Sequence, residues 1–105
     1  ISKYIVPTGI NQISSEVPET FELFPNYPNP FNPSTIIRFN IKDSRFTTLK
    51  VYDILGRESE TLVNEELNPG IYEVNWNASN YPSGVYYYTL ITQSFSQTKK
   101  MVLVK

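Results

Sequence analysis

Short runs of alternating apolar and polar residues recur along the chain from residue 21 onward. Every second side chain of a β-strand points to the same face, so this alternation indicates half-buried strands. The clearest run places Tyr72, Val74 and Trp76 on one face, opposite two polar residues. The runs that we interpret as strands cover residues 35–42, 48–54, 58–63, 71–76, 85–92 and 97–104.

Turn-forming residues separate these runs. Gly56 supplies one turn, because glycine adopts a positive φ without a steric penalty. Residues 64–70, which end in Pro69-Gly70, are predicted to form a loop, and residues 77–84 a further turn. Strands at a spacing of roughly 8–12 residues with such turns are typical of an all-β sandwich or barrel. We therefore predict a seven-stranded antiparallel β-sandwich.

Composition narrows the possible functions. The 105 residues suffice for one domain, and 40% apolar with 14% aromatic residues suffices for a packed core. A net charge of −1 argues against nucleic acid as a partner. The chain has neither His nor Cys, which excludes disulfides, thiolate zinc sites and the commonest general base. We predict a protein that is not an enzyme and that has no cofactor, metal or small-molecule substrate.

Two weaker chemical signals remain. Glu58 with Glu60, or Glu65 with Glu66, could in principle form a catalytic carboxylate pair, but so small a sandwich rarely offers the necessary cleft. We interpret these residues as a solvated strand edge and loop. The sequence 77–79 (NAS) fits a glycosylation site, which a three-residue pattern often does by chance.

A proline-rich arm precedes the first clear strand, with the sequence PNYPNPFNPST over residues 25–35. Proline fixes φ and biases its preceding residue toward extended backbone, so the arm should be stiff. Tyr27 and Phe31 are its aromatic anchors. One interpretation is that the arm caps the sandwich and buries both rings. The other is that the arm is a ligand for an aromatic groove on a partner protein.

Residues 1–20 differ in character from the predicted sandwich at 21–105. Residues 14–19 read as a short polar linker, whereas the stretch before them is too apolar for a solvated tether. We predict that it is buried, and we favour burial against a neighbouring subunit over the chain's own sandwich. The chain starts without Met, which suggests a trimmed fragment or a mature chain. The candidate self-assembly residues are Ile1, Tyr4, Ile5, Val6, Ile10 and Ile13.

Six sequence blocks follow one another through the rest of the chain. They are YPNPFNPST (27–35), VYDILGR (51–57), TLV (61–63), GIYEVNW (70–76), SGVYYY (83–88) and TKKMVLVK (98–105). In this order and spacing the blocks resemble the type A C-terminal sorting domain of type IX secretion. The resemblance covers residues 21–105, and Ser59, at a position that is usually apolar in the family, is one of its few departures.

The resemblance implies an Ig-like β-sandwich with an extended proline-rich arm at the C-terminus of a secreted protein. It also implies recognition by the type IX secretion machinery at the outer membrane of a Gram-negative bacterium, often followed by cleavage as the cargo is anchored at the cell surface. An edge strand flanked by lysines can also simply resist aggregation. The partner-recognition residues that we infer are Tyr27, Phe31, Lys99, Lys100, Met101, Val102, Leu103, Val104 and Lys105.

The family blocks also set the register of residues 85–92, where both faces are apolar. We expect Tyr86, Tyr88 and Leu90 to be buried, and Val85, Tyr87 and Ile91 to face outward. The full predicted core is Phe39, Ile41, Val51, Tyr72, Val74, Trp76, Tyr86, Tyr88, Leu90 and Met101.

The main functional hypothesis is thus an export signal without an active site. An alternative from another class is a structural subunit of an extracellular filament, which would use the N-terminal segment for strand addition. A small carbohydrate-binding module, suggested only by the aromatic content, is a third hypothesis. A larger cargo preceding Ile1 would favour export, and a native polymer of this chain would favour the filament.

Overall fold

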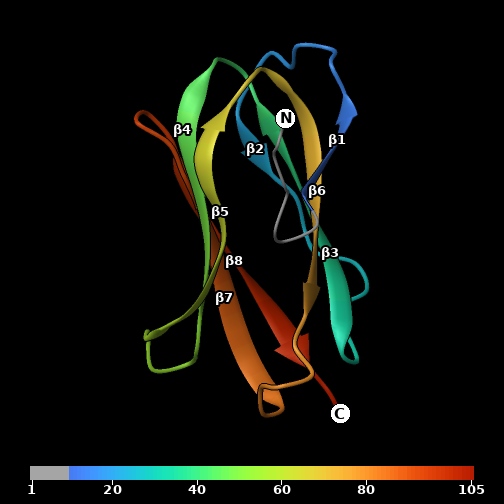
Figure 1. The fold of residues 1–105 in the computed structure, drawn as a ribbon. Coiled ribbons are helices and arrows are strands. Elements are labelled where there is room, and N and C mark those ends of the chain that lie inside the picture. The colour runs from blue at the N-terminus through green and yellow to red at the C-terminus, as the bar shows by residue number, and fades with distance from the viewer. Residues whose placement is uncertain (1–9) are drawn as a thin grey trace, which may run out of the picture.

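The computed structural model describes residues 10–105, which fold into two antiparallel sheets packed face to face (Figure 1). The predicted Ig-like β-sandwich is confirmed, with eight strands rather than seven. The described strands are β1 (Ile10–Ser14), β2 (Glu22–Leu23), β3 (Ser34–Ile41), β4 (Arg45–Tyr52), β5 (Glu58–Leu67), β6 (Gly70–Asn77), β7 (Gly84–Ile91) and β8 (Ser96–Leu103).

The first sheet has the strand order β1-β6-β3-β2. Strands β3 and β6 pair so that the inward side chains of one lie beside those of the other, as for Phe39 and Tyr72 or Ile37 and Val74. The rings of Phe39 and Tyr72 stack with their centroids 5.7 Å apart. Such cross-strand pairs stabilise a sheet, and here they form its core-facing side.

The second sheet has the order β5-β4-β7-β8, which leaves β8 at one edge. Its inward residues again pair across strands, as with Leu49 and Leu90 or Tyr86 and Met101. All predicted core residues are buried. The register predicted for β7 is confirmed, because Tyr86, Tyr88 and Leu90 are buried while Ile91 on the other face is exposed.

Strand β5 is longer than the sequence predicted. Residues 64–67, expected in a loop, continue the strand and pair with the start of β4 up to Arg45 and Leu67. These four residues pair without a register shift, but three of them are polar (Asn64, Glu65 and Glu66). Local polarity therefore concealed a strand that its neighbour β4 stabilises.

Strand β1 belongs to the first sheet and pairs antiparallel with β6 of the same chain. Ile10 is buried in the core, and Ile13 is exposed. The sequence favoured burial of this segment against a neighbouring subunit. The structure differs for residues 10–14, which dock on a sheet of their own chain. The other candidate self-assembly residues lie outside the described residues, and they are Ile1, Tyr4, Ile5 and Val6. The division at residue 20 stays a prediction.

Candidate functional site

The proline-rich arm lies along the free edge of the C-terminal strand. The backbone N–H of Phe31 donates to the carbonyl oxygen of Val102 at 2.9 Å, and the N–H of Val104 donates to the carbonyl oxygen of Phe31 at 2.9 Å. The side-chain oxygen of Asn29 accepts a third hydrogen bond, from the N–H of Val102. The arm therefore acts as a short additional strand beside the end of β8.

The other end of β8 has one further contact on this side. The N–H of Leu23 in β2 donates to the side-chain oxygen of Gln97 at 3.3 Å. Backbone groups of a strand alternate between its two edges, so Thr98 and Lys100 face the same side as Val102. Within residues 10–105 no strand pairs with Thr98 and Lys100 there. The middle of β8 therefore presents an open edge.

Of the two aromatic anchors of the arm, one is buried and the other is exposed. Phe31 is 1% exposed, and its ring lies 5.8 Å from that of Trp76, centroid to centroid. Tyr27 is 78% exposed. The expectation that the arm buries both rings is thus confirmed for Phe31 and wrong for Tyr27. The backbone of Tyr27 pairs with Ile36 on β3, which holds the side chain outside the sandwich.

Polar contacts hold the arm in place. The buried side-chain amide of Asn26 donates to the hydroxyl of Thr35 at 2.9 Å, and that hydroxyl donates to the carbonyl oxygen of Pro28 at 2.9 Å. Just before the arm, the carbonyl oxygen of Phe24 accepts the hydroxyl of Tyr88 from the core at 2.8 Å. Burial raises the pKa of Tyr88 to about 12, so this hydroxyl remains a donor at neutral pH.

The side chains from Lys99 onward divide into an anchoring set and an accessible set. Met101 and Leu103 are buried in the core and hold the strand to the sandwich. The exposed side chains are Lys100, Val104 and Lys105, and those of Lys99 and Val102 are half-buried. None of the three lysines forms an ion pair within the described part of the chain.

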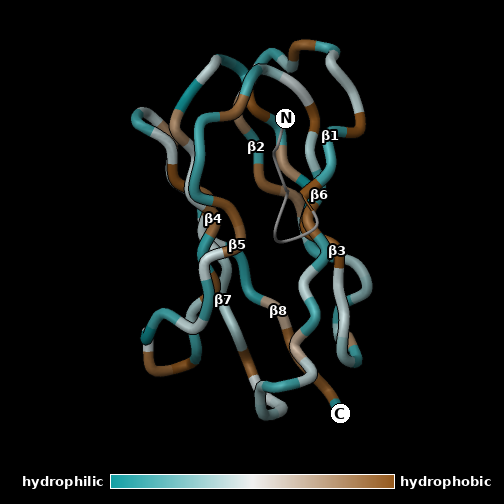
Figure 2. Tube along the Cα trace, in the orientation of Figure 1, coloured by the Kyte–Doolittle hydropathy of each residue, from teal (hydrophilic) through white to brown (hydrophobic). Residues whose placement is uncertain are grey.

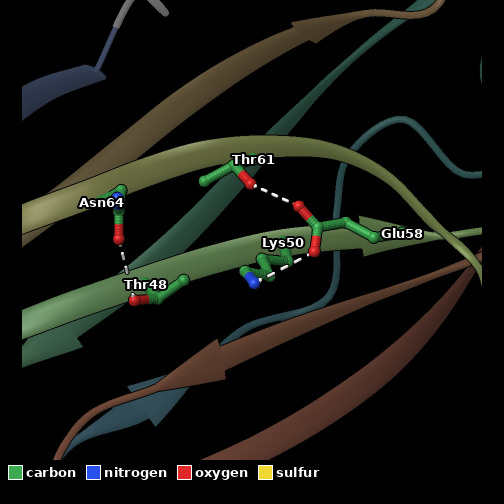
Figure 3. A network of polar contacts seen from close by, with 5 residues as sticks. All are labelled: Thr48, Lys50, Glu58, Thr61 and Asn64. Atoms are coloured by element: carbon green, nitrogen blue, oxygen red, sulfur yellow. Dashed lines mark hydrogen bonds and ion pairs between the residues drawn. The ribbon is translucent and has the colours of Figure 1, made fainter.

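The outer face of the second sheet carries a ladder of polar contacts (Figure 3). The ammonium group of Lys50 lies 3.0 Å from Glu58, whose other oxygen accepts the hydroxyl of Thr61 at 2.8 Å. These hydrogen bonds, with Lys50 as the larger cause, lower the pKa of Glu58. The carboxylate is thus held ionised by its neighbours.

Of the two carboxylate pairs considered from the sequence, Glu58 and Glu60 bind different partners. Glu60 turns away from Glu58 and accepts the indole N–H of Trp76 at 2.9 Å. Each carboxylate therefore has its own structural partners. Among residues 10–105 no group of three or more acidic, His or Cys side chains could hold a metal ion. No helix of the described residues is long and apolar enough to cross a membrane.

The sequence predicted the turn at Gly56 in the hairpin between β4 and β5, but its exposed apolar tip was not among the candidate sites. The Asp53 carboxylate accepts hydrogen bonds from the backbone N–H groups of Leu55 and Arg57 at 2.9 and 3.0 Å. These hydrogen bonds lower the pKa of Asp53, and the bond from the backbone N–H of Arg57 is the largest cause. Ile54 and Leu55 at the tip are 65% and 73% exposed. In the sequence, two aliphatic residues directly before the turn glycine Gly56 were the signal for this apolar tip.

The described residues thus form a small β-sandwich whose last strand is clamped by a proline-rich arm. Residues 26–105 match the family described as the secretion system C-terminal sorting domain. Since the match spans most of the chain, the protein belongs to this family of type IX secretion. Strand β8 and residues 26–35 of the arm lie within the matched residues.

A solved structure with a similar fold is that of PorZ from Porphyromonas gingivalis, described as an essential bacterial surface component of the type IX secretion system. The sequence identity is 22% and the TM-score is 0.57, over 79% of this chain and 11% of the PorZ chain. This likeness concerns the fold alone, since the chain spans only a small part of PorZ. No curated protein sequence matched the chain.

Proposed function

We propose that this domain is an export signal that the type IX secretion machinery reads at the outer membrane, through strand β8 and the arm that clamps it. The observation that carries the proposal is the family match over residues 26–105, which contains β8 and the arm from residue 26 onward. In this function the domain directs its cargo to the cell surface or the extracellular space. The domain itself needs neither an active site nor a cofactor.

The arm and β8 suggest that the machinery reads a folded domain. Phe31 and Val104 are far apart in sequence and become neighbours only when the sandwich has folded. The anchoring side chains Met101 and Leu103 then face inward, so recognition would use the exposed Lys100 and Lys105 and the open edge of β8. An open strand edge with lysines on its margin suits addition of a partner strand.

The experiment is a fusion of the chain to a secreted reporter in a bacterium with a type IX system. Removing residues 99–105 should leave the fusion in the periplasm. Because that truncation also removes the core residues Met101 and Leu103, a second variant is needed. Lys100→Glu with Lys105→Glu reverses two exposed charges, and it should reduce delivery while the purified domain keeps its thermal unfolding midpoint. Normal surface delivery of both variants would contradict the proposal.

The filament alternative gains no comparable support. It required an apolar N-terminal strand that is free to add to a neighbour. In the described residues β1 already pairs with β6 of its own chain, and the buried Ile10 completes its own core. We therefore do not propose self-assembly.

A further inference from the structure

One end of the sandwich gathers three segments that are distant in sequence. The hairpin between β4 and β5, the loop between β6 and β7, and the chain after β8 all lie at the end marked C (Figure 1). The hairpin is apolar at its tip (Figure 2), where Ile54 and Leu55 expose most of their side-chain surface. Clustered exposed apolar side chains, unlike scattered ones, mark interaction sites.

The hairpin tip is held in one conformation. Besides accepting two backbone N–H groups, the Asp53 carboxylate binds the guanidinium of Arg57 at 2.9 Å. The backbone N–H of Asp53 and the carbonyl oxygen of Arg57 close the loop at 2.9 Å, and Gly56 takes the positive φ of 83° that the turn requires. A rigid display of Ile54 and Leu55 lowers the entropy that binding would cost.

The apolar tip continues onto the outer face of the second sheet. Tyr52 pairs with Tyr87, so the next outward position on β7, Val85, lies on the side of Ile54. Ile54 and Val85 indeed line one shallow hollow of about 190 Å³. Val85 pairs in turn with Val102 of β8. We call these residues, together with the exposed Val104, the apolar rim: Ile54, Leu55, Val85, Val102 and Val104.

Unneutralised positive charges border the apolar rim. Lys100 is the cross-strand neighbour of Tyr87, one row from Val85 and Val102. Lys105 lies at the same end of the sandwich, where its ammonium group donates to the carbonyl oxygen of Ser79 in the loop between β6 and β7 at 2.6 Å. Neither lysine has a carboxylate partner within residues 10–105. A complementary partner surface would be an apolar recess with carboxylates at its margin.

We propose that the apolar rim is a second contact with the secretion machinery, in which the Ile54–Leu55 tip inserts into an acid-bordered apolar recess of a machinery protein while β8 is read beside it. This inference rests on the proposed function and adds a partner chemistry to it. Two separate contacts on one rigid domain would fix its orientation. A strand edge alone allows a partner to bind in more than one register.

The test uses the reporter fusion with Ile54→Ser and Leu55→Ser combined. Surface delivery should fall about tenfold or more, as when central apolar anchors are removed from an interface. The matched control is Phe46→Ser, which removes another exposed apolar side chain (58% exposed) near the opposite end of β4. This control should be delivered normally. The purified tip variant should keep the wild-type thermal unfolding midpoint.

A pair of single variants tests the partner chemistry and avoids altering Ile54. Leu55 contributes to the turn through its backbone N–H, so a new side chain leaves that hydrogen bond in place. Against an acid-bordered recess Leu55→Asp should reduce delivery more than Leu55→Lys. Equal delivery of the two would overturn the assigned chemistry.

The outcomes separate this inference from the proposed function. One outcome is that the 99–105 truncation and the Lys100→Glu, Lys105→Glu variant stay in the periplasm while the tip variant reaches the surface normally. In that case the machinery reads β8 but does not contact the apolar rim. An equal loss for Phe46→Ser would also overturn the inference, because it would indicate a general need for surface apolarity. If the truncated and lysine variants reach the surface, the proposed function itself fails.

Discussion

At the residue scale, the aromatic side chains around Trp76 connect the arm to the core. The Trp76 ring lies 5.8 Å from Phe31, 5.5 Å from Tyr81 and 5.8 Å from Tyr86, centroid to centroid. Such pairs contribute about 0.5–1.5 kcal/mol each beyond the burial of their area. Phe31 therefore ties the arm, and with it the end of β8, to both sheets.

Replacing Phe31 by Ala should lower the free energy of unfolding by about 3–5 kcal/mol, because it leaves a cavity beside Trp76. Tyr27→Ala is the matched control in the same arm, since Tyr27 is mostly exposed, and it should change stability by about 0.5 kcal/mol or less. Urea unfolding followed by tryptophan fluorescence measures both. Equal losses for the two variants would mean that Phe31 is not the anchor of the arm.

Asp53 should make stability depend on pH. Its folded-state pKa is lowered by hydrogen bonds from Arg57 and Leu55, so the unfolded state binds a proton more readily. The contribution is therefore present above the ordinary pKa of about 3.9 and is lost as the pH falls through the lower folded-state value. Wild type should be more stable than Asp53→Asn at pH 7, and the difference should shrink in acid. A constant difference across pH would refute this.

At the element scale, the position of β1 depends on a close approach at the start of β6. A Cβ added to Gly70 would lie 2.7 Å from the backbone carbonyl oxygen of Ser14, closer than two such atoms can approach. Glycine at this position therefore allows β1 to cover the edge of β6. The absence of a side chain at Gly70 in β6 thus determines how closely β1 can pack.

We expect Gly70→Ala to displace β1 and to destabilise the sandwich by about 1–3 kcal/mol. Gly84→Ala is a matched control, because Gly84 has a similar φ (154° against 159°) but nothing within 4 Å of the added atom. Amide hydrogen exchange should rise in residues 10–14 for the first variant only. Similar exchange in both variants would show that backbone strain, not contact with β1, limits this position.

Strand β8 shows how one element combines two requirements. Met101 and Leu103 need the core, whereas an open edge at Thr98 and Lys100 risks unwanted pairing with other chains. The arm covers the end of that edge, and lysines border the remainder. The element is thus accessible to a partner strand and protected against self-association.

At the scale of the whole molecule, the two inner strands of the first sheet, β6 and β3, each gain an edge strand from the N-terminal part of the described chain. Strand β1 lies on β6, and β2 covers part of β3. Both strands precede the residues that match the sorting-domain family, which begin at 26. The segment upstream of the matched region therefore completes the sandwich rather than simply tethering it.

We expect the 105-residue chain to be monomeric, since β1 occupies the edge of β6 that a neighbour would otherwise use. Light scattering should give a mass near 12.1 kDa at all accessible concentrations. The matched chain without residues 1–14 exposes that edge, and it should be less stable or should associate. A dimer of the full chain that dissociates on this deletion would restore the neighbouring-subunit interpretation.

The sequence by itself determined the all-β class, most strand positions and the inward faces of β3, β6 and β7. Alternation such as Tyr72, Val74 and Trp76 is a local property of the chain, and one buried face per strand follows from it. The six blocks added the family and the register of β7, which alternation alone left open. The candidate recognition residues at 99–105 were also identified in this way, although their role remains a proposal.

Only the tertiary structure decided which exposed groups share a surface. Tyr27 and Phe31 are both aromatic residues of one arm, yet only Phe31 meets Trp76, a residue far along the chain. In the same way β5 extends through residues 64–67 because β4 lies beside it, and β1 lies on its own sheet because Gly70 leaves room. Long-range contacts of this kind depend on the whole packing arrangement, so no local pattern encodes them.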